Sequence, residues 1–229
     1  MPQPAAFHIG FPLFHGLTHL DLSGPHEILS RLPGAHCHLL AHTLEPVTSA
    51  SGLALMPSLR FADAPPLDML CVPGGPGHLQ AMADAALLDF LRAQASGCRF
   101  ITAVCTGAMV LAAAGLLRGY RATTHWMSLD RLAAFGAIPS TERVVHDRDR
   151  VTGGGVTAGI DFALTVAALL HGEAVVRSIQ LHVQYAPHPP FDRGEPAQAA
   201  PALVAAVRRG AAGYAAAMDE ADRRALASR

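Results

Sequence analysis

One cysteine of this chain stands where folds of the α/β class place a nucleophile. The apolar run 100–104 predicts a buried strand that ends at Cys105, and the Ala- and Leu-rich run 107–117 predicts a helix directly after it. A nucleophile at such a corner is lifted out of the sheet, with the N–H of Thr106 facing the reacting atom. The start of a helix also favours the thiolate. The pattern predicts a catalytic Cys105; the alternative is an inert buried cysteine.

A pair of glycines is expected at the same edge of the sheet. Gly74 and Gly75 follow the predicted strand 67–72, and a backbone without side chains can approach a ligand closely. The N–H groups of Gly75 and Thr106 could then form an oxyanion pocket. An ordinary turn at the end of a strand explains the same glycines equally well.

A carboxyl group is the third candidate for chemistry. Asp21 lies between two leucines at a predicted helix start, where an acid is normally an N-cap. Beside a thiolate its pKa would instead be raised by like charge and burial, which makes it a proton donor near neutral pH. Glu27 competes for this role. It lies roughly 120° around a regular helix from Asp21, so the two acids are not expected to reach the same point.

Length and composition favour a compact α/β protein. The chain has 229 residues, 51% of them hydrophobic and 15% charged, with a formal net charge of −1. It can therefore bury a large core, and disorder is excluded. We find no Lys/Arg cluster typical of nucleic-acid binding, no secretory signal and no apolar run of membrane-spanning length. We expect a cytoplasmic protein with neither nucleic-acid nor membrane partners.

The other cysteines and the histidines do not predict disulfides or a metal site. The three further cysteines fall in strand-like runs or a turn: Cys37, Cys71 and Cys98. A large core and a cytosolic setting make disulfides between them unnecessary. His36, His38 and His42 lie close in sequence, but no cysteine or carboxylate completes a zinc ligand set nearby. A half-exposed strand face is favoured for these histidines.

Strands alternate with helices along the chain. We expect strands at 6–12, 36–43, 67–72, 100–104, 121–124, 143–146 and 150–152, a hairpin at 47–56, and helices at 21–32, 85–95, 107–117, 128–135, 156–170, 173–185 and 201–227. This order predicts a mostly parallel sheet covered on both faces, with the site at the carboxyl ends of its strands. We assign 1–195 to a single domain and 196–229 to a C-terminal helical extension, packed on the body or part of a subunit contact.

Six motifs, in this order, resemble the DJ-1/PfpI (ThiJ) superfamily. They are Phe11–Phe14, Leu20–Pro25, Cys71–Gly75, Val104–Gly107, Ala122–Trp126 and Thr152–Leu164. The resemblance covers residues 6–195, and within the superfamily the motifs are most similar to the isonitrile hydratases. It implies a flavodoxin-like three-layer α/β sandwich, a homodimer, and neither a metal nor an organic cofactor.

The resemblance also implies roles for single residues. It places the nucleophile on Cys105, the acid on Asp21 and a functional hydroxyl on Thr106. Many proteases and chaperones of the superfamily have a histidine after the cysteine. Thr106 at that position counts against peptidase activity, because no adjacent imidazole can act as the base. We expect Gly75, Trp126 and His125 to bind substrate or line its pocket, with a purely structural role as the alternative for His125.

The activity implied by the resemblance is hydration of a small-molecule isonitrile, R–N≡C, to an N-substituted formamide. Cys105 would attack the isonitrile carbon while Asp21 supplies a proton. The alternatives are glyoxalase- or deglycase-like chemistry on reactive carbonyls, and a redox sensor in which Cys105 is oxidised to a sulfinate. A ligand-sensing domain of a transcription regulator is disfavoured, because the tail 196–229 is too short for a helix-turn-helix module.

Overall fold

A seven-stranded sheet forms the centre of the protein. The computed structural model describes residues 5–191 and 194–227. The strand order is β10-β11-β7-β6-β1-β2-β5, and every neighbouring pair is parallel except β10 with β11. The strands are β1 (Phe7–Pro12), β2 (Ala35–Ala41), β5 (Leu59–Arg60), β6 (Met69–Val72), β7 (Phe100–Val104), β10 (Val144–Asp147) and β11 (Arg150–Gly153). The mostly parallel sheet predicted from the sequence is confirmed.

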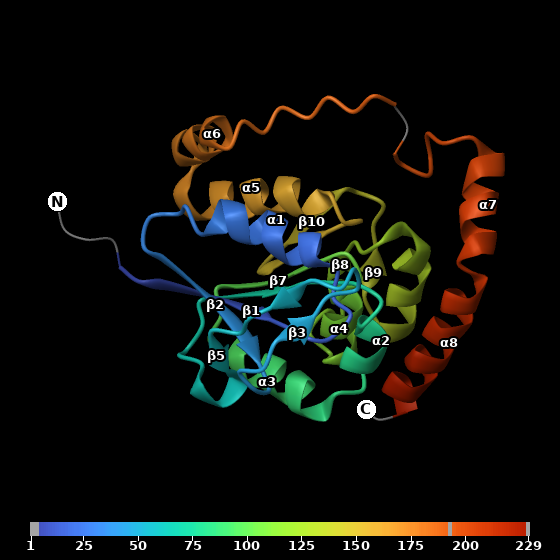
Figure 1. Ribbon diagram of the computed structural model, residues 1–229, viewed down its shortest axis with the longest axis horizontal. Coiled ribbons are helices and arrows are strands. Elements are labelled where there is room, and N and C mark those ends of the chain that lie inside the picture. The colour runs from blue at the N-terminus through green and yellow to red at the C-terminus, as the bar shows by residue number, and fades with distance from the viewer. Residues whose placement is uncertain (1–4, 192–193, 228–229) are drawn as a thin grey trace.

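Helices cover both faces of the sheet and complete the three-layer sandwich. Figure 1 shows α1 (His19–Leu29), α5 (Ala158–His171) and α6 (Glu173–His182) on one side of the sheet. On the other side, α3 (Ala85–Ala95) and α4 (Gly107–Ala113) pack against β6 and β7. Both central strands are buried along their whole length, as expected for apolar runs covered on two faces.

Helix boundaries follow local sequence signals. The side chain of Asp84 caps α3 by accepting a hydrogen bond of 3.1 Å from the N–H of Leu87. Leu87, Leu88 and Leu91 then form the buried stripe of that helix. In α6, Val176 and Ile179 are buried on one face, as the helical spacing predicts. None of the helices that the structure describes is long and apolar enough to cross a membrane.

Small elements frame the ends of the strands. The predicted hairpin is present as β3 (Val47–Thr48) paired with β4 (Ala54–Leu55). A parallel pair, β8 (Arg121–Ala122) and β9 (Ile138–Pro139), flanks η2 (Trp126–Phe135), a 3-10 helix where an α-helix was expected. The sequence analysis did not predict β5, β9, η1 (Phe61–Asp63) or α2 (His78–Ala81), which are only two to four residues long.

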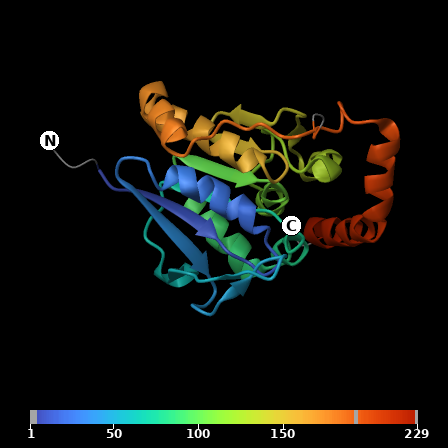
Figure 2. The ribbon, with the colours of Figure 1, turned by 45° about the horizontal axis from the view of Figure 1, so that its top comes forward.

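The prediction of a single helix over 201–227 is wrong. The structure has two helices, α7 (Pro201–Gly210) and α8 (Ala212–Ala227), which meet at Ala211. Glycine is a poor helix former, and Gly210 ends the first of them. Figure 2 shows that the chain turns sharply between α7 and α8 and that α8 runs back toward the sheet.

The second of these helices is anchored to the body. Its buried side chains are Met218, Ala221 and Ala225. Ser128 Oγ of η2 donates a hydrogen bond of 3.4 Å to the sulfur of Met218. Arg131, also from η2, pairs with Asp222 at 2.6 Å and with Asp219 at 2.7 Å. The helix therefore packs on the body, the first of the two placements considered from the sequence.

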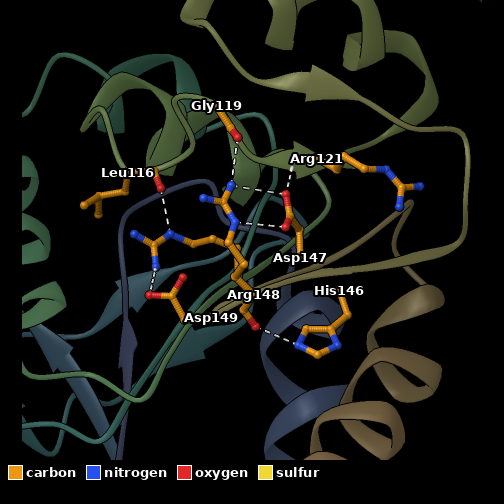
Figure 3. A network of polar contacts seen from close by, with 8 residues as sticks. Leu116, Gly119, Arg121, His146, Asp147, Arg148 and Asp149 are labelled. Carbon is orange, nitrogen blue, oxygen red and sulfur yellow. Dashed lines mark hydrogen bonds and ion pairs between the residues drawn. The ribbon is translucent and has the colours of Figure 1, made fainter.

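Charged side chains secure the turn of the edge hairpin β10–β11. Arg148 at its tip donates hydrogen bonds to Asp147 at 3.0 Å and to the carbonyl of Gly119 at 2.8 Å (Figure 3). Asp147 in turn accepts a 2.7 Å hydrogen bond from the N–H of Arg121. The 147–149 turn predicted between two strands is thus tied to the segment after α4.

We expect the Arg131 ion pairs to hold α8 in place. Arg131→Gln removes a half-buried charged partner from Asp222, which should cost about 1–3 kcal/mol of docking free energy. Hydrogen exchange of the amides in 212–227 measures this loss as faster opening. Arg223→Gln is the control, because its pair with Glu220 lies on the exposed face of α8 itself. Equal exchange in the two variants would contradict the anchoring role.

Candidate active site

The loops after β6 and β7 touch through their backbones. Val72 lies opposite Ala103 in the parallel register, so the two strands end side by side. A Cβ on Gly74 would lie 2.4 Å from the N of Thr106, and a Cβ on Gly107 would lie 2.2 Å from the carbonyl oxygen of Val72. Only glycine permits this approach, which brings Gly74 and Gly75 to Cys105 as the sequence predicted.

The corner at Cys105 has the backbone conformation of a nucleophile elbow. Its φ of 56° is left-handed, which costs a residue other than glycine about 1–3 kcal/mol. The N–H of Cys105 donates to the carbonyls of Gly153 and Gly154, each at 3.0 Å. Its own carbonyl accepts a 2.8 Å hydrogen bond from Thr124 Oγ1. These bonds fix the strained corner that points the sulfur out of the sheet, as predicted.

Asp21 lies beside this corner, whereas Glu27 does not. The Asp21 side chain is fully buried, and its Oδ2 accepts a 3.0 Å hydrogen bond from the N–H of Gly74. Helix α1 is held there by close packing on α5, since a Cβ on Gly159 would lie 3.1 Å from Pro25 Cδ. Glu27 is exposed and pairs with Arg31. The structure therefore selects Asp21 as the acid near the sulfur.

Burial raises the pKa of Asp21 to about 7. Hydrogen bonds from the Cys105 thiol and from the N–H of Gly74 act in the opposite direction and limit the rise. The sequence analysis named like charge as a second cause, and this was wrong, because the cysteine acts on the carboxyl as a hydrogen-bond donor. The acid thus exchanges its proton near neutral pH, as predicted, and burial is the reason.

The Cys105 sulfur rests as a thiol. Burial and the negative charge of Asp21 raise its pKa well above the usual value, and hydrogen bonds from Thr106 compensate only in part. The expectation that the thiolate would be favoured is therefore wrong, since the effect of burial on the Cys105 pKa outweighs that of the helix start. The carboxyl and the thiol influence each other's ionisation, so their protons are lost in two steps that belong to the pair.

The hydroxyl of Thr106 is bonded to the glycine loop. The N–H of Gly75 donates to Thr106 Oγ1 at 2.8 Å, and the hydroxyl lies 3.1 Å from the carbonyl oxygen of Gly75. The oxyanion pocket expected from the N–H groups of Gly75 and Thr106 is therefore not formed. Gly75 gives its N–H to the hydroxyl, and the N–H of Thr106 is directed to the sulfur. Thr106 links the loop to the nucleophile instead.

A cavity of about 260 Å³ opens above Cys105. Its lining residues are Thr18, Gly75, Pro76, Cys105, Thr106, His125, Met127, Val156 and Tyr214. No Asp, Glu, Lys or Arg is among these lining residues, and burial lowers the pKa of His125, which keeps its imidazole neutral. The cavity suits a small molecule without a formal charge.

His125 and Trp126 lie side by side, with ring centres 5.9 Å apart, but only His125 reaches the cavity at Cys105. His125 lines the cavity at Cys105, and its Nδ1 accepts a 3.4 Å hydrogen bond from the N–H of Met127 at the start of η2. Trp126 lines a neighbouring cavity of about 440 Å³, where the Arg208 guanidinium lies 4.9 Å from the centre of a Trp126 ring. His125 thus lines both cavities, whereas Trp126 lines only the adjacent one, and their roles toward a substrate stay predictions.

Sequence reasoning missed several lining residues. Met127 directly follows the motif 122–126, and Val156 lies within the motif 152–164. Their place in these motifs could have identified both as lining residues. Tyr214 arrives from α8, more than a hundred residues after the nucleophile, and no local pattern marks it.

The histidines of β1 and β2 lie against one another in the described part of the chain. His8 stacks on His36 and His38 along β1 and β2, at ring distances of 5.3 and 5.2 Å. In the residues that the structure describes, no group of three or more His, Cys, Asp or Glu side chains is placed to hold a metal ion. All four cysteines are free thiols.

Comparison with known proteins identifies the family. The DJ-1/PfpI family model matches residues 8–169. The chain belongs to the DJ-1/PfpI family. It is 52% identical to an isonitrile hydratase of Pseudomonas putida over 207 residues, which cover 90% of this chain and 91% of that one. A crystal structure of a ThiJ/PfpI family protein from Pseudomonas syringae matches with a TM-score of 0.92 and 41% identity, covering 98% and 92% of the two chains.

Other members of the family share smaller parts. The transcriptional regulator GbdR of Pseudomonas aeruginosa is 34% identical over 179 residues, which are 75% of this chain and 48% of the regulator. The DJ-1beta structure of Drosophila melanogaster has a TM-score of 0.71 at 24% identity, and covers 80% of this chain and all of that one. The latter likeness shows the fold alone.

We expect Asp21→Asn to stabilise the protein at alkaline pH. The Asp21 pKa is 3.8 without burial and about 7 in the fold, so its contribution to the free energy of unfolding is complete below pH 4 and is lost as pH rises through 7. The loss amounts to about 4 kcal/mol. Asparagine stays neutral and avoids it. Urea unfolding at pH 4, 6 and 8 should show a growing advantage of the variant.

The exposed Glu27→Gln on the same helix is the matched control and should show no such trend. An advantage of Asp21→Asn that stays constant from pH 4 to pH 8 would refute the buried-acid assignment.

Proposed function

We propose that this chain hydrates an isonitrile, R–N≡C, to the N-substituted formamide R–NH–CHO. The observation that carries the proposal is a cysteine at the base of a cavity lined without charged side chains, with the fully buried acid Asp21 behind it. An isonitrile is small, uncharged and reactive at carbon, which matches that cavity. The 52% identity to an isonitrile hydratase across nearly the full length of both chains supports the same reaction.

The first half of the reaction uses the coupled pair at Cys105 and Asp21. In the form with one proton, the proton moves from sulfur to the Asp21 carboxylate as the substrate enters. The sulfur then forms a bond to the isonitrile carbon, and Asp21 gives the proton to that same carbon. The product is a covalent thioimidate, R–N=CH–S–Cys105, beside an ionised Asp21. Positioned acid catalysis of this kind contributes about 10²–10⁴ in rate.

The second half consumes one water. Asp21 takes a proton from the water, whose oxygen adds to the thioimidate carbon, and the substrate nitrogen receives that proton. The resulting R–NH–CH(OH)–S–Cys105 then breaks its C–S bond, with the hydroxyl proton passing to Asp21 and the electron pair remaining on sulfur. The formamide leaves, and the pair again holds one proton. Thr106, which bonds to the Gly75 loop through Oγ1 and to sulfur through its N–H, orients these groups.

The family resemblance leads us to propose a homodimer in the cytoplasm as the working form. The structure describes one chain, so chromatography with light scattering tests the assembly.

We expect Cys105→Ala to abolish formamide production from cyclohexyl isocyanide, because no other group at the cavity can form the covalent intermediate. Asp21→Asn should lower kcat by about 10²–10⁴, since amide nitrogen cannot supply the proton. Chromatography of the formamide measures both effects. Cys98→Ala is the matched control, because Cys98 lies apart from the cavity lining. Wild-type turnover in Cys105→Ala would exclude the covalent mechanism.

If purified wild-type protein makes no formamide, the proposed reaction fails, and methylglyoxal consumption and peroxide oxidation of Cys105 become the next assays.

We expect Thr106→Val to lower kcat about 10²-fold with the fold retained. Valine has the shape of threonine but leaves the N–H of Gly75 without its acceptor, so the loop beside the sulfur loses its fixed position. Steady-state kinetics give kcat, and circular dichroism checks the fold. Thr165→Val removes a hydroxyl that bonds within α5 and should leave kcat unchanged. Similar kcat values in the two variants would exclude a role for the Thr106 hydroxyl.

A further inference from the structure

Tyr214 reaches the catalytic cavity from the far end of the chain. Its side chain lines the same cavity as Cys105, Thr106 and His125. Its pKa is raised to about 12 by burial and by the negative charge that Cys105 carries when it is ionised. The phenol therefore keeps its proton at every pH at which the protein would work.

The helix that carries Tyr214 holds it firmly. Met218 lies one turn further along α8 and is buried against Ser128 of η2. Arg131 Nη2 donates a 3.3 Å hydrogen bond to the carbonyl of Ala215, the residue after Tyr214. The same η2 begins directly after His125, which lines the cavity. The helix that carries Tyr214 is thus held by η2, the element next to His125 in the cavity wall.

A buried histidine determines which way the phenol points its proton. His78 of α2 is 1% exposed, and burial lowers its pKa to about 4, so the ring is neutral at physiological pH. Its Nδ1 lies 2.9 Å from the carbonyl oxygen of Gly75 and 3.2 Å from the hydroxyl of Tyr214. A carbonyl oxygen only accepts hydrogen bonds, so Nδ1 carries the ring proton and donates it to the Gly75 carbonyl, with the Tyr214 oxygen as the second acceptor of a three-centre bond.

The Tyr214 oxygen is consequently an acceptor toward His78. In the described part of the chain, Nδ1 of His78 is the one hydrogen-bond partner of the Tyr214 hydroxyl. Because Nδ1 already supplies the proton in that contact, the O–H of Tyr214 must be directed elsewhere. The cavity above Cys105 is the space that the side chain lines.

We propose that Tyr214 is a catalytic residue that donates a hydrogen bond to the substrate nitrogen, and that His78 is the positioning residue that directs this donor. The proposal rests on the isonitrile hydration proposed above. The isonitrile carbon is bonded to Cys105 in the thioimidate, and the nitrogen, with its lone pair, is the next atom outward. A phenol across the cavity is the group that meets it.

This hydrogen bond acts on the second half of the reaction. Water adds to the thioimidate carbon only if that carbon is electrophilic, and a hydrogen bond to nitrogen draws electron density away from it. The phenol polarises the C=N bond without losing its own proton, because the nitrogen takes its proton from water by way of Asp21. Formation of the C–S bond, by contrast, depends on Cys105 and Asp21.

Tyr214→Phe tests the proposal, since it keeps the ring and removes only the hydroxyl. With cyclohexyl isocyanide we expect kcat and KM to fall together, each about 10- to 100-fold, so that kcat/KM, which reports formation of the C–S bond, stays unchanged. The thioimidate should then accumulate, and intact-protein mass spectrometry should show a gain of one isonitrile mass on Cys105. A role confined to packing would not produce this covalent species.

Tyr120→Phe is the matched control, because Tyr120 packs against Arg148 and Arg150 and is not part of the cavity lining. It should show wild-type kcat and no adduct. Wild-type kcat without adduct in Tyr214→Phe would overturn the role of Tyr214 and leave the proposed reaction standing. A wild-type protein that makes no formamide would overturn the proposed reaction itself, and this inference with it.

Two variants of His78 test the positioning step. Asparagine can place its amide N–H near the position of Nδ1, so His78→Asn should retain most of kcat. His78→Leu offers no donor, which frees the Tyr214 proton to turn away, and it should reproduce the adduct seen in Tyr214→Phe. Equal adduct levels in the two His78 variants would overturn the positioning role.

Discussion

The mutual influence of a buried carboxyl and a buried thiol on each other's protonation is the constraint on which this site depends. Neither group is well placed to ionise alone, since burial raises the pKa of both. The negative charge of an ionised Asp21 raises the pKa of Cys105 further, so the two groups resist being ionised together. A proton can therefore move between them with little change in structure. The surrounding residues hold Asp21 and Cys105 close together and exclude bulk water.

Backbone contacts hold Asp21 and Cys105 in place. Gly74 lies so close to the N atoms of Thr106 and Gly107 that no side chain fits between them, and its own N–H bonds to Asp21. The left-handed corner at Cys105 is retained by carbonyls from the end of β11 and by the hydroxyl of Thr124. Three neighbouring strands and one helix thus meet at one edge, and the strain at a single residue is offset by bonds that only the assembled sheet can supply.

Sequence patterns predicted the parts of this arrangement that are local. The apolar runs ending at Val72 and Val104 identified both central strands, and a nucleophile at a strand-to-helix corner followed from them. The pKa of the sulfur did not follow, because helix position is visible in a sequence and depth of burial is not. For the same reason the donor role of the Gly75 N–H could not be assigned before its neighbour Thr106 Oγ1 was located. Tyr214 could not be assigned to the cavity without knowing where the C-terminal helices run.

The wall that α8 contributes has a consequence for the order in which the protein matures. Chains are synthesised from the N-terminus, and everything else that lines the cavity precedes residue 160, whereas Tyr214 belongs to the last helix described. During synthesis the sheet and the cysteine corner can form while one side of the cavity still stands open to solvent. The wall that Tyr214 provides is added only when α8 docks on η2. The enclosure of the cavity therefore depends on a segment made after all of its other lining residues.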